Sequence, residues 1–203
     1  MALLSHVFTV AVRDWQILPE NPLSGVRRPK TALPRDRRIN DDEIERLLYT
    51  FGYEAAKPVK TIIARVGAAF LFAIETGMRA GEICSLKWVN ISGVVAKLEI
   101  TKNGFPRSVP LSKNALSIIE QLPKTGDFVF DLKTSQVDSL FRKARSKSLI
   151  QNLHFHDTRH EAITRLARKL DVLDLARMVG IRDLKILMVY YNATPDDIAL
   201  RLE

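Results

Sequence analysis

A basic stretch rich in proline, residues 17–39, constrains the fold of this chain more than any other feature. It holds four of the nine prolines in the 203 residues, namely Pro19, Pro22, Pro29 and Pro34. Proline fixes φ and has no amide hydrogen, so closely spaced prolines keep a chain extended. We therefore expect a linker over 17–39, a short segment over 1–16 before it, and the main folded body over 40–203.

The linker is also positively charged. The only acidic residues in it are Glu20 and Asp36, so its net charge is +4. Its six basic residues are Arg27, Arg28, Lys30, Arg35, Arg37 and Arg38. The whole chain carries 31 Lys and Arg against 23 Asp and Glu, a formal charge of +8. Such a field favours a polyanionic partner such as nucleic acid, so the six linker residues are candidates for DNA binding. A solvated linker is the alternative interpretation.

Composition narrows the class of protein further. Hydrophobic residues make up 46% of the chain and charged residues 27%, as in ordinary globular domains. No apolar run approaches the roughly 18 to 20 residues that span a bilayer, so we expect no membrane partner. The single cysteine, Cys84, cannot form an internal disulfide. These features predict an intracellular, cytoplasmic protein.

The first 16 residues predict one amphipathic helix. Leu4, Phe8, Ala11 and Trp15 recur at helical spacing, and Pro19 ends any helix soon after. One helix cannot bury its own apolar face, so it either packs on the body or ends a domain absent from this chain. We favour the second interpretation, the last helix of a truncated domain.

The body predicts many helices and a small antiparallel sheet. Asn40 and Glu43 form a capping box, and Gly77 separates a buried helix from a shorter one that Arg79 begins. Asn103 and Gly104 lie between two strand patterns and predict a hairpin. The predicted helices are 59–75, 80–88, 112–122, 135–146, 156–170, 172–179 and 183–191, with a short one after Thr194, and the predicted strands are 94–102 and 107–111.

The side chains suit phosphoryl transfer at a phosphodiester without a bound metal or cofactor. That reaction needs donors on the nonbridging oxygens, an in-line nucleophile and an acid for the leaving oxygen. We find no closely spaced group of carboxylate, Cys or His residues that would hold Mg²⁺ or Zn²⁺. Arginine can neutralise a phosphate through its planar fork of donors.

Four motifs, in this order, resemble the tyrosine recombinases, and in particular integrases of the phage type. The motifs are TGMRAGEI at 76–83, TKNG at 101–104 with RSVPL at 107–111, HDTRH at 156–160, and MVYYN at 188–192. The resemblance covers most of the chain. It implies the mainly α catalytic domain of DNA breaking and rejoining enzymes over 40–203, with 1–16 as the last helix of a core-binding domain and 17–39 as the interdomain linker.

The resemblance also assigns catalytic roles. Arg79 and Arg159 correspond to the two arginines that clamp the scissile phosphate. Lys102, on the hairpin, corresponds to the general acid that protonates the departing 5′ hydroxyl. His156 corresponds to the motif histidine that hydrogen-bonds the phosphate or accepts the tyrosine proton.

Two tyrosines compete for the nucleophile. In the family the tyrosine follows, by nine residues, a histidine or tryptophan that comes directly after a helix-ending glycine. Gly180 places that position at Ile181 and the nucleophile at Tyr190, with Tyr191 as the alternative. Attack by the phenolic oxygen leaves a 3′-phosphotyrosine.

Ile181 departs from the family pattern because isoleucine has no hydrogen-bond donor. Loss of one such donor costs about 10² to 10³ in rate, so we expect weakened cleavage. Glu82 and His160 are supporting candidates: Glu82 to orient Arg79 or the hairpin, His160 to replace the missing donor. His154 is left outside the site.

The function we predict is therefore site-specific recombination or integration of DNA. The alternatives are a weakened or inactive DNA-binding protein of the same fold, and an enzyme similar to type IB topoisomerases. The resemblance implies a tetramer on DNA for the full-length protein. We expect this form, without most of the core-binding domain, to stay monomeric and to bind DNA weakly.

Overall fold

The computed structural model describes residues 2–27, 37–99 and 106–191. The chain divides into two compact units, Met1–Arg35 and Asp36–Glu203. In the first unit, helix α1 (Ala2–Arg13) is followed by a segment that turns back on it. Asn21 fastens this turn, because its amide nitrogen donates to the Ser5 carbonyl and to Thr9 Oγ1, both at 3.0 Å. Leu3, Leu4 and Val7 on α1 are exposed.

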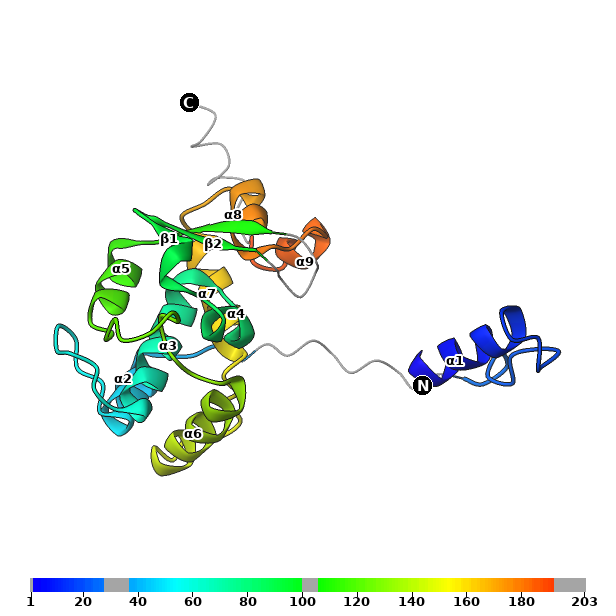
Figure 1. Ribbon diagram of the computed structural model, residues 1–203, viewed down its shortest axis with the longest axis horizontal. Helices are drawn as coiled ribbons and strands as arrows, with labels where there is room; N and C mark the ends of the chain where they lie inside the picture. The colour runs from blue at the N-terminus through cyan, green and yellow to red at the C-terminus, as the bar shows by residue number, and fades with distance from the viewer. Residues whose placement is uncertain (1, 28–36, 100–105, 192–203) are drawn as a thin grey trace. The chain divides into compact units, whose positions relative to one another are not determined.

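The second unit is built around helix α3 (Ile62–Thr76), which is buried over most of its length (Figure 1). It contacts five other helices, and this explains its nearly continuous apolar sequence. The five are α2 (Asp41–Phe51), α4 (Ala80–Cys84), α5 (Lys113–Glu120), α6 (Thr134–Lys147) and α7 (Asp157–Leu166). The core thus fixes where α3 ends, and the candidate site begins at that end.

The sheet is small and antiparallel, as predicted. A 3₁₀ turn, η1 (Trp88–Asn90), leads into three strands in the order β1 (Ile91–Ser92), β2 (Val95–Leu98) and β3 (Arg107–Pro110). Leu98 pairs with Arg107 at the last described rung of the β2–β3 ladder. The predicted hairpin turn at Asn103 and Gly104, together with Lys102, lies outside the described residues.

Two last helices pack as a separate small cluster against α7. Helix α8 (Val172–Val179) has the predicted bounds, and α9 (Leu184–Met188) is shorter than the predicted helix 183–191. Ile163 of α7 and Leu175, Val179 and Leu187 form its buried apolar centre. Helix α8 also contacts β3, so the strand and the last helices meet beside α7.

Local signals placed most helix starts, and several predicted helices are longer than the observed ones. Asn40 and Glu43 make the predicted capping box. The predicted helix 59–75 begins three residues later, because Thr61 caps α3 by accepting from the Ala64 amide. The predicted helix 80–88 stops at Cys84, and the predicted helix 156–170 stops at Leu166.

Candidate active site

The turn between α3 and α4 positions Arg79. Gly77 ends α3 with φ of +66°, a conformation that glycine adopts without strain. A side chain there would also be tight, since a Cβ would lie 3.2 Å from Val179 Cγ1. Arg79 follows in extended conformation as the N-cap of α4, and 22% of its side chain is exposed. The Arg79 guanidinium is therefore partly exposed, close to the buried C-terminal end of α3.

Glu82 joins Arg79 to a second arginine, Arg107. Glu82 Oε2 accepts from the Arg79 backbone N–H at 2.8 Å, and Oε1 accepts from Arg79 Nη1 at 3.1 Å. Arg107 donates from both terminal nitrogens, Nη1 to Oε1 at 2.6 Å and Nη2 to Oε2 at 2.8 Å. Burial would raise the pKa of Glu82, but these bonds outweigh burial and lower it below its ordinary value. Glu82 is therefore an ionised carboxylate between two guanidinium groups.

Arg159 is the third guanidinium of this cluster, and α7 carries it. Its Nη1 donates to the Gly77 carbonyl at 2.5 Å and its Nη2 to the Val179 carbonyl at 2.6 Å. These carbonyls lie at the C-terminal ends of α3 and α8, where helices leave acceptors without intrahelical partners. Burial, with the nearby charges of Arg79 and Arg107, lowers the pKa of Arg159 to about 10, so it stays charged at neutral pH.

Tyr190 packs against His160, the residue after Arg159 on α7. The two ring centroids are 5.0 Å apart, and Tyr190 interacts electrostatically with Arg159. Tyr191 is placed differently, since its hydroxyl donates to the Leu170 carbonyl at 2.9 Å. The structure thus brings Arg79, Arg159 and Tyr190 together. The hydroxyl of the alternative nucleophile, Tyr191, is instead occupied by a hydrogen bond to the main chain.

The remaining motif residues surround this cluster. His156 is exposed at the start of α7, one turn before Arg159, whose backbone N–H bonds the His156 carbonyl at 3.1 Å. His160 is half-buried against Tyr190. Asp157 shapes the turn before α7, because its Oδ2 accepts from the His154 N–H at 2.8 Å. His154 acts there through its backbone.

Ile181 places an apolar side chain where the family pattern has a donor. It packs against the apolar cluster of α7, α8 and α9. It also lines a groove of about 710 Å³ between β3 and the last helices. Arg107 and Gly180 line the same groove, so the groove borders the arginine cluster.

The linker arginines divide into three groups. Arg28, Lys30 and Arg35 lie outside the described residues, and Arg27 is exposed in the first unit. Arg37 bonds both oxygens of Glu43. Arg38 donates from Nε to Glu161 at 2.7 Å. Two of the six DNA-binding candidates are thus ion-paired with carboxylates of α2 and α7, and their contact with DNA stays a prediction.

Sequence reasoning assigned no role to Arg107, although a signal was available. Positions 107, 109 and 111 alternate along one face of β3, and Val109 and Leu111 are buried. A charged residue on that inward face needs a buried partner, which is Glu82. Glu161 was missed as well, because its partner Arg38 is 123 positions away.

Two searches of the described residues gave negative findings. In residues 2–27, 37–99 and 106–191, no three His, Cys, Asp or Glu side chains are grouped so that they could hold a metal ion. Over the same ranges, no helix is long and apolar enough to cross a membrane.

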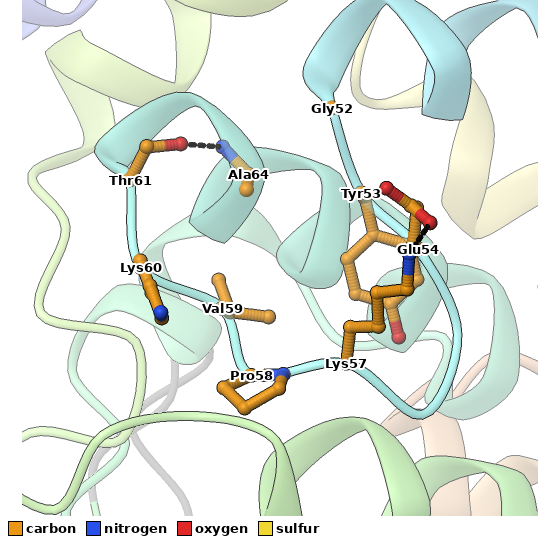
Figure 2. Close-up of a pocket in the computed structure, with 9 residues that line it drawn as sticks. All are labelled: Gly52, Tyr53, Glu54, Lys57, Pro58, Val59, Lys60, Thr61 and Ala64. Carbon is orange, nitrogen blue, oxygen red and sulfur yellow. Dashed lines mark hydrogen bonds and ion pairs between the residues drawn. The ribbon is translucent and has the colours of Figure 1, made fainter.

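A separate pocket of about 150 Å³ lies at the connection between α2 and α3 (Figure 2). Its polar groups are engaged locally: Glu54 pairs with Lys57, and Thr61 caps α3. It shares no residue with the arginine cluster, and we assign it no function.

Comparison with known proteins places this geometry in a family. The model of the phage integrase family matches residues 37–196. A "Putative integrase/recombinase" of Haemophilus influenzae is 41% identical over the whole chain, which spans 68% of that protein. A shufflon-specific DNA recombinase of Escherichia coli is 37% identical over 94% of the chain, which spans 49% of that protein. The chain therefore belongs to the phage integrase family of tyrosine recombinases.

Solved structures agree on the fold. A lambda integrase dimer bound to a core site superposes with a TM-score of 0.72, at 22% identity, over 93% of this chain and 57% of that one. A lambda integrase tetramer bound to a Holliday junction also gives 0.72, at 21% identity, over 94% of this chain and 57% of that one. The mainly α fold with a small sheet, predicted from sequence, is thus the fold of an integrase catalytic domain.

Proposed function

We propose that this chain cleaves and rejoins DNA strands through Tyr190. The proposal is carried by the arrangement of three side chains: Arg159 bonds the Gly77 carbonyl in the turn that holds Arg79, and the Tyr190 ring, after α9, packs on His160 next to Arg159. The net charge of the described cluster is +2, since Arg79, Arg107 and Arg159 face the single carboxylate of Glu82. An excess of positive charge with unused donors suits a phosphodiester.

The proposed step is an in-line displacement at phosphorus. The Tyr190 oxygen attacks, a Tyr–O–P bond forms, and the P–O5′ bond breaks. The phenolic proton passes to a base, for which His156 is the candidate, and the 5′ oxygen takes a proton from Lys102. Arg79 and Arg159 stabilise the charge on the nonbridging oxygens, and rejoining reverses the same steps.

We further propose that Ile181 slows this step. A side chain without a donor leaves one nonbridging oxygen with less stabilisation, which costs up to about 10² to 10³ in rate. His160 lies against Tyr190 and is the neighbour best placed to compensate. The apolar side chain of Ile181 beside the arginine cluster is the observation that favours the second candidate function, a DNA-binding protein of the same fold with reduced catalysis.

The partners belong to the proposal too. We propose double-stranded DNA as the substrate, met in the cytoplasm, and a tetramer as the acting form of the full-length protein. The solved lambda integrases support this, since one structure is a dimer bound to a core site and another is a tetramer bound to a Holliday junction. Residues 1–16 would end a core-binding domain and 17–39 would connect it to the body at 40–203.

A denaturing gel tests the chemistry. The protein is mixed with a labelled library of nicked DNA half-sites, which trap the covalent intermediate, beside Tyr190→Phe, Ile181→His and the matched control Tyr191→Phe. We expect an adduct that Tyr190→Phe abolishes, that Tyr191→Phe retains and that Ile181→His increases by about tenfold. Binding of DNA without an adduct in any variant would support the second candidate instead.

A further inference from the structure

Arg107 is held differently from Arg79, the more exposed arginine that shares Glu82 with it. Three of its donors are used: both terminal nitrogens bond Glu82, and Nε donates to the Met178 carbonyl at 3.1 Å. Only 8% of its side chain is exposed. Within the part of the chain that the structure describes, the guanidinium of Arg79 by contrast donates to Glu82 alone, at 3.1 Å. Arg107 is thus committed to the protein, and Arg79 keeps donors for a ligand.

The surroundings of Arg107 are built to hold it there. Strand β3 presents it inward beside Leu98, and the end of α8 lies across it. Gly180 leaves the necessary space, because a Cβ at that position would lie 3.0 Å from Arg107 Cδ and 3.1 Å from Nη1. Gly180 also has φ of +66°, so its conformation and its missing side chain serve the same contact.

We propose that Arg107 is a positioning residue that occupies the carboxylate of Glu82 and thereby limits Arg79 to one side-chain bond with it, so that the other Arg79 donors can bind the scissile phosphate. This inference rests on the proposed function. Glu82 must be present, because it accepts from the Arg79 backbone N–H and fixes the turn. It is also an anion that competes with the phosphate for the Arg79 side chain. The two shorter bonds from Arg107 occupy both carboxylate oxygens and weaken that competition, which leaves Arg79 with a single side-chain bond of 3.1 Å to Glu82.

Removing Arg107 should therefore act through Glu82. In Arg107→Gln the carboxylate would draw Arg79 into a paired geometry, and the phosphate would lose that guanidinium. A second substitution, Glu82→Gln, removes the competing charge but keeps an oxygen that accepts from the Arg79 amide. The double variant should thus recover what the single variant loses, which a merely structural role for Arg107 does not predict.

The first measurement is the rate of adduct formation on nicked half-sites at saturating DNA. We expect Arg107→Gln to be slower by about 10- to 100-fold, less than direct loss of a phosphate donor. We expect the Arg107→Gln, Glu82→Gln double variant to come within about threefold of Glu82→Gln alone. The control is Arg65→Gln, which breaks a partly buried ion pair with Asp131 outside the cluster and should leave the rate unchanged. A double variant as slow as Arg107→Gln would overturn the proposal.

A second measurement does not depend on catalysis. Inorganic phosphate should raise the unfolding midpoint of the wild-type chain more than chloride does at equal ionic strength, because the cluster binds the anion. We expect this shift to be lost in Arg79→Ala, reduced in Arg107→Gln, and restored in the double variant. A full shift in Arg107→Gln contradicts the inference. No adduct in the wild type, with these phosphate shifts intact, contradicts only the proposed function.

Folding of the variant is monitored separately. Arg107→Lys keeps a charge but lacks the planar fork, so it should fold and give an intermediate rate and an intermediate phosphate shift. If Arg107→Gln does not fold, the comparison passes to Arg107→Lys with and without Glu82→Gln. Equal rates for Arg107→Lys and wild type would then count against the proposal.

Discussion

Glu82 and Glu161 are two of the buried carboxylates with arginine partners among the described residues, and the difference between them distinguishes the proposed phosphate site from a structural ion pair. Glu82 faces three guanidinium groups, so its surroundings carry a net positive charge. Glu161 accepts from Arg38 and Arg165, and Arg165 also pairs with Asp41 at 3.0 Å. Among the described residues, that second group has two positive and two negative side chains. Both groups contain arginines and carboxylates, so residue type alone does not identify the proposed phosphate site. The excess positive charge and the unused arginine donors around Glu82 do.

The two carboxylates also meet different parts of the chain. Glu161 lies two residues after Arg159 on α7 and accepts from the Ile39 N–H at 3.1 Å, so it ties the start of the body to this helix. Glu82 ties β3 to the turn before α4. Helix α7 therefore carries a phosphate-binding candidate and a structural anchor within one turn.

Removing Arg79 should lower the rate of catalysis far more than it lowers the stability of the fold. We expect Arg79→Ala to lower the rate of adduct formation by about 10² to 10³, or 2.7 to 4 kcal/mol. Its stability should change by under about 1 kcal/mol, because the side chain is partly exposed and makes one described ion pair. Adduct gels and urea unfolding check the two halves. A large loss of stability with little loss of rate would reverse the assignment of this arginine.

Removing Glu161 should have the opposite signature. Burial would raise the pKa of Glu161, but bonds from Arg38, Arg165 and the Ile39 amide outweigh burial and lower it to about 2, against an ordinary value of 4.5. Since one pKa unit equals about 1.4 kcal/mol, the carboxylate stabilises the fold by about 3 kcal/mol. We expect Glu161→Gln to lose this much at pH 7, measured by urea unfolding, with adduct formation by the folded protein unchanged.

The pH dependence of that loss follows from the direction of the shift. The pKa is lower in the folded state, so the stabilisation is complete above pH 4.5 and declines as the pH falls towards 2. The difference in stability between wild type and Glu161→Gln should shrink over the same interval. A difference that is constant from pH 7 to pH 3 would mean that the side chain acts by packing and not by charge.

The same contrast explains what sequence could predict. The capping box of Asn40 and Glu43 and the helix-ending Gly77 and Gly180 depend on residues a few positions apart, and each was found from sequence. The family motifs named Arg79, Arg159 and Tyr190, which the structure brings together. The partner of Arg107 is 25 positions away, and sequence spacing contains no signal for that distance.

Removing Arg38 should give the smallest change in stability, and it tests whether Arg38 acts only in the ion pair with Glu161 or also binds DNA. Its side chain is 43% exposed, so its bonds to Glu161 are screened by solvent, and we expect Arg38→Gln to cost under about 1 kcal/mol in urea unfolding.

Sequence composition predicts that the same residue contacts DNA. If it does, the slope of log K against log salt should fall by about one for the variant. The matched control is Arg46→Gln, which breaks an exposed pair with Asp42 of similar kind on α2. An unchanged slope in Arg38→Gln would assign Arg38 to the anchor alone. A reduced slope with unchanged stability would mean that Arg38 contacts DNA, and that its ion pair with Glu161 breaks when the protein binds DNA.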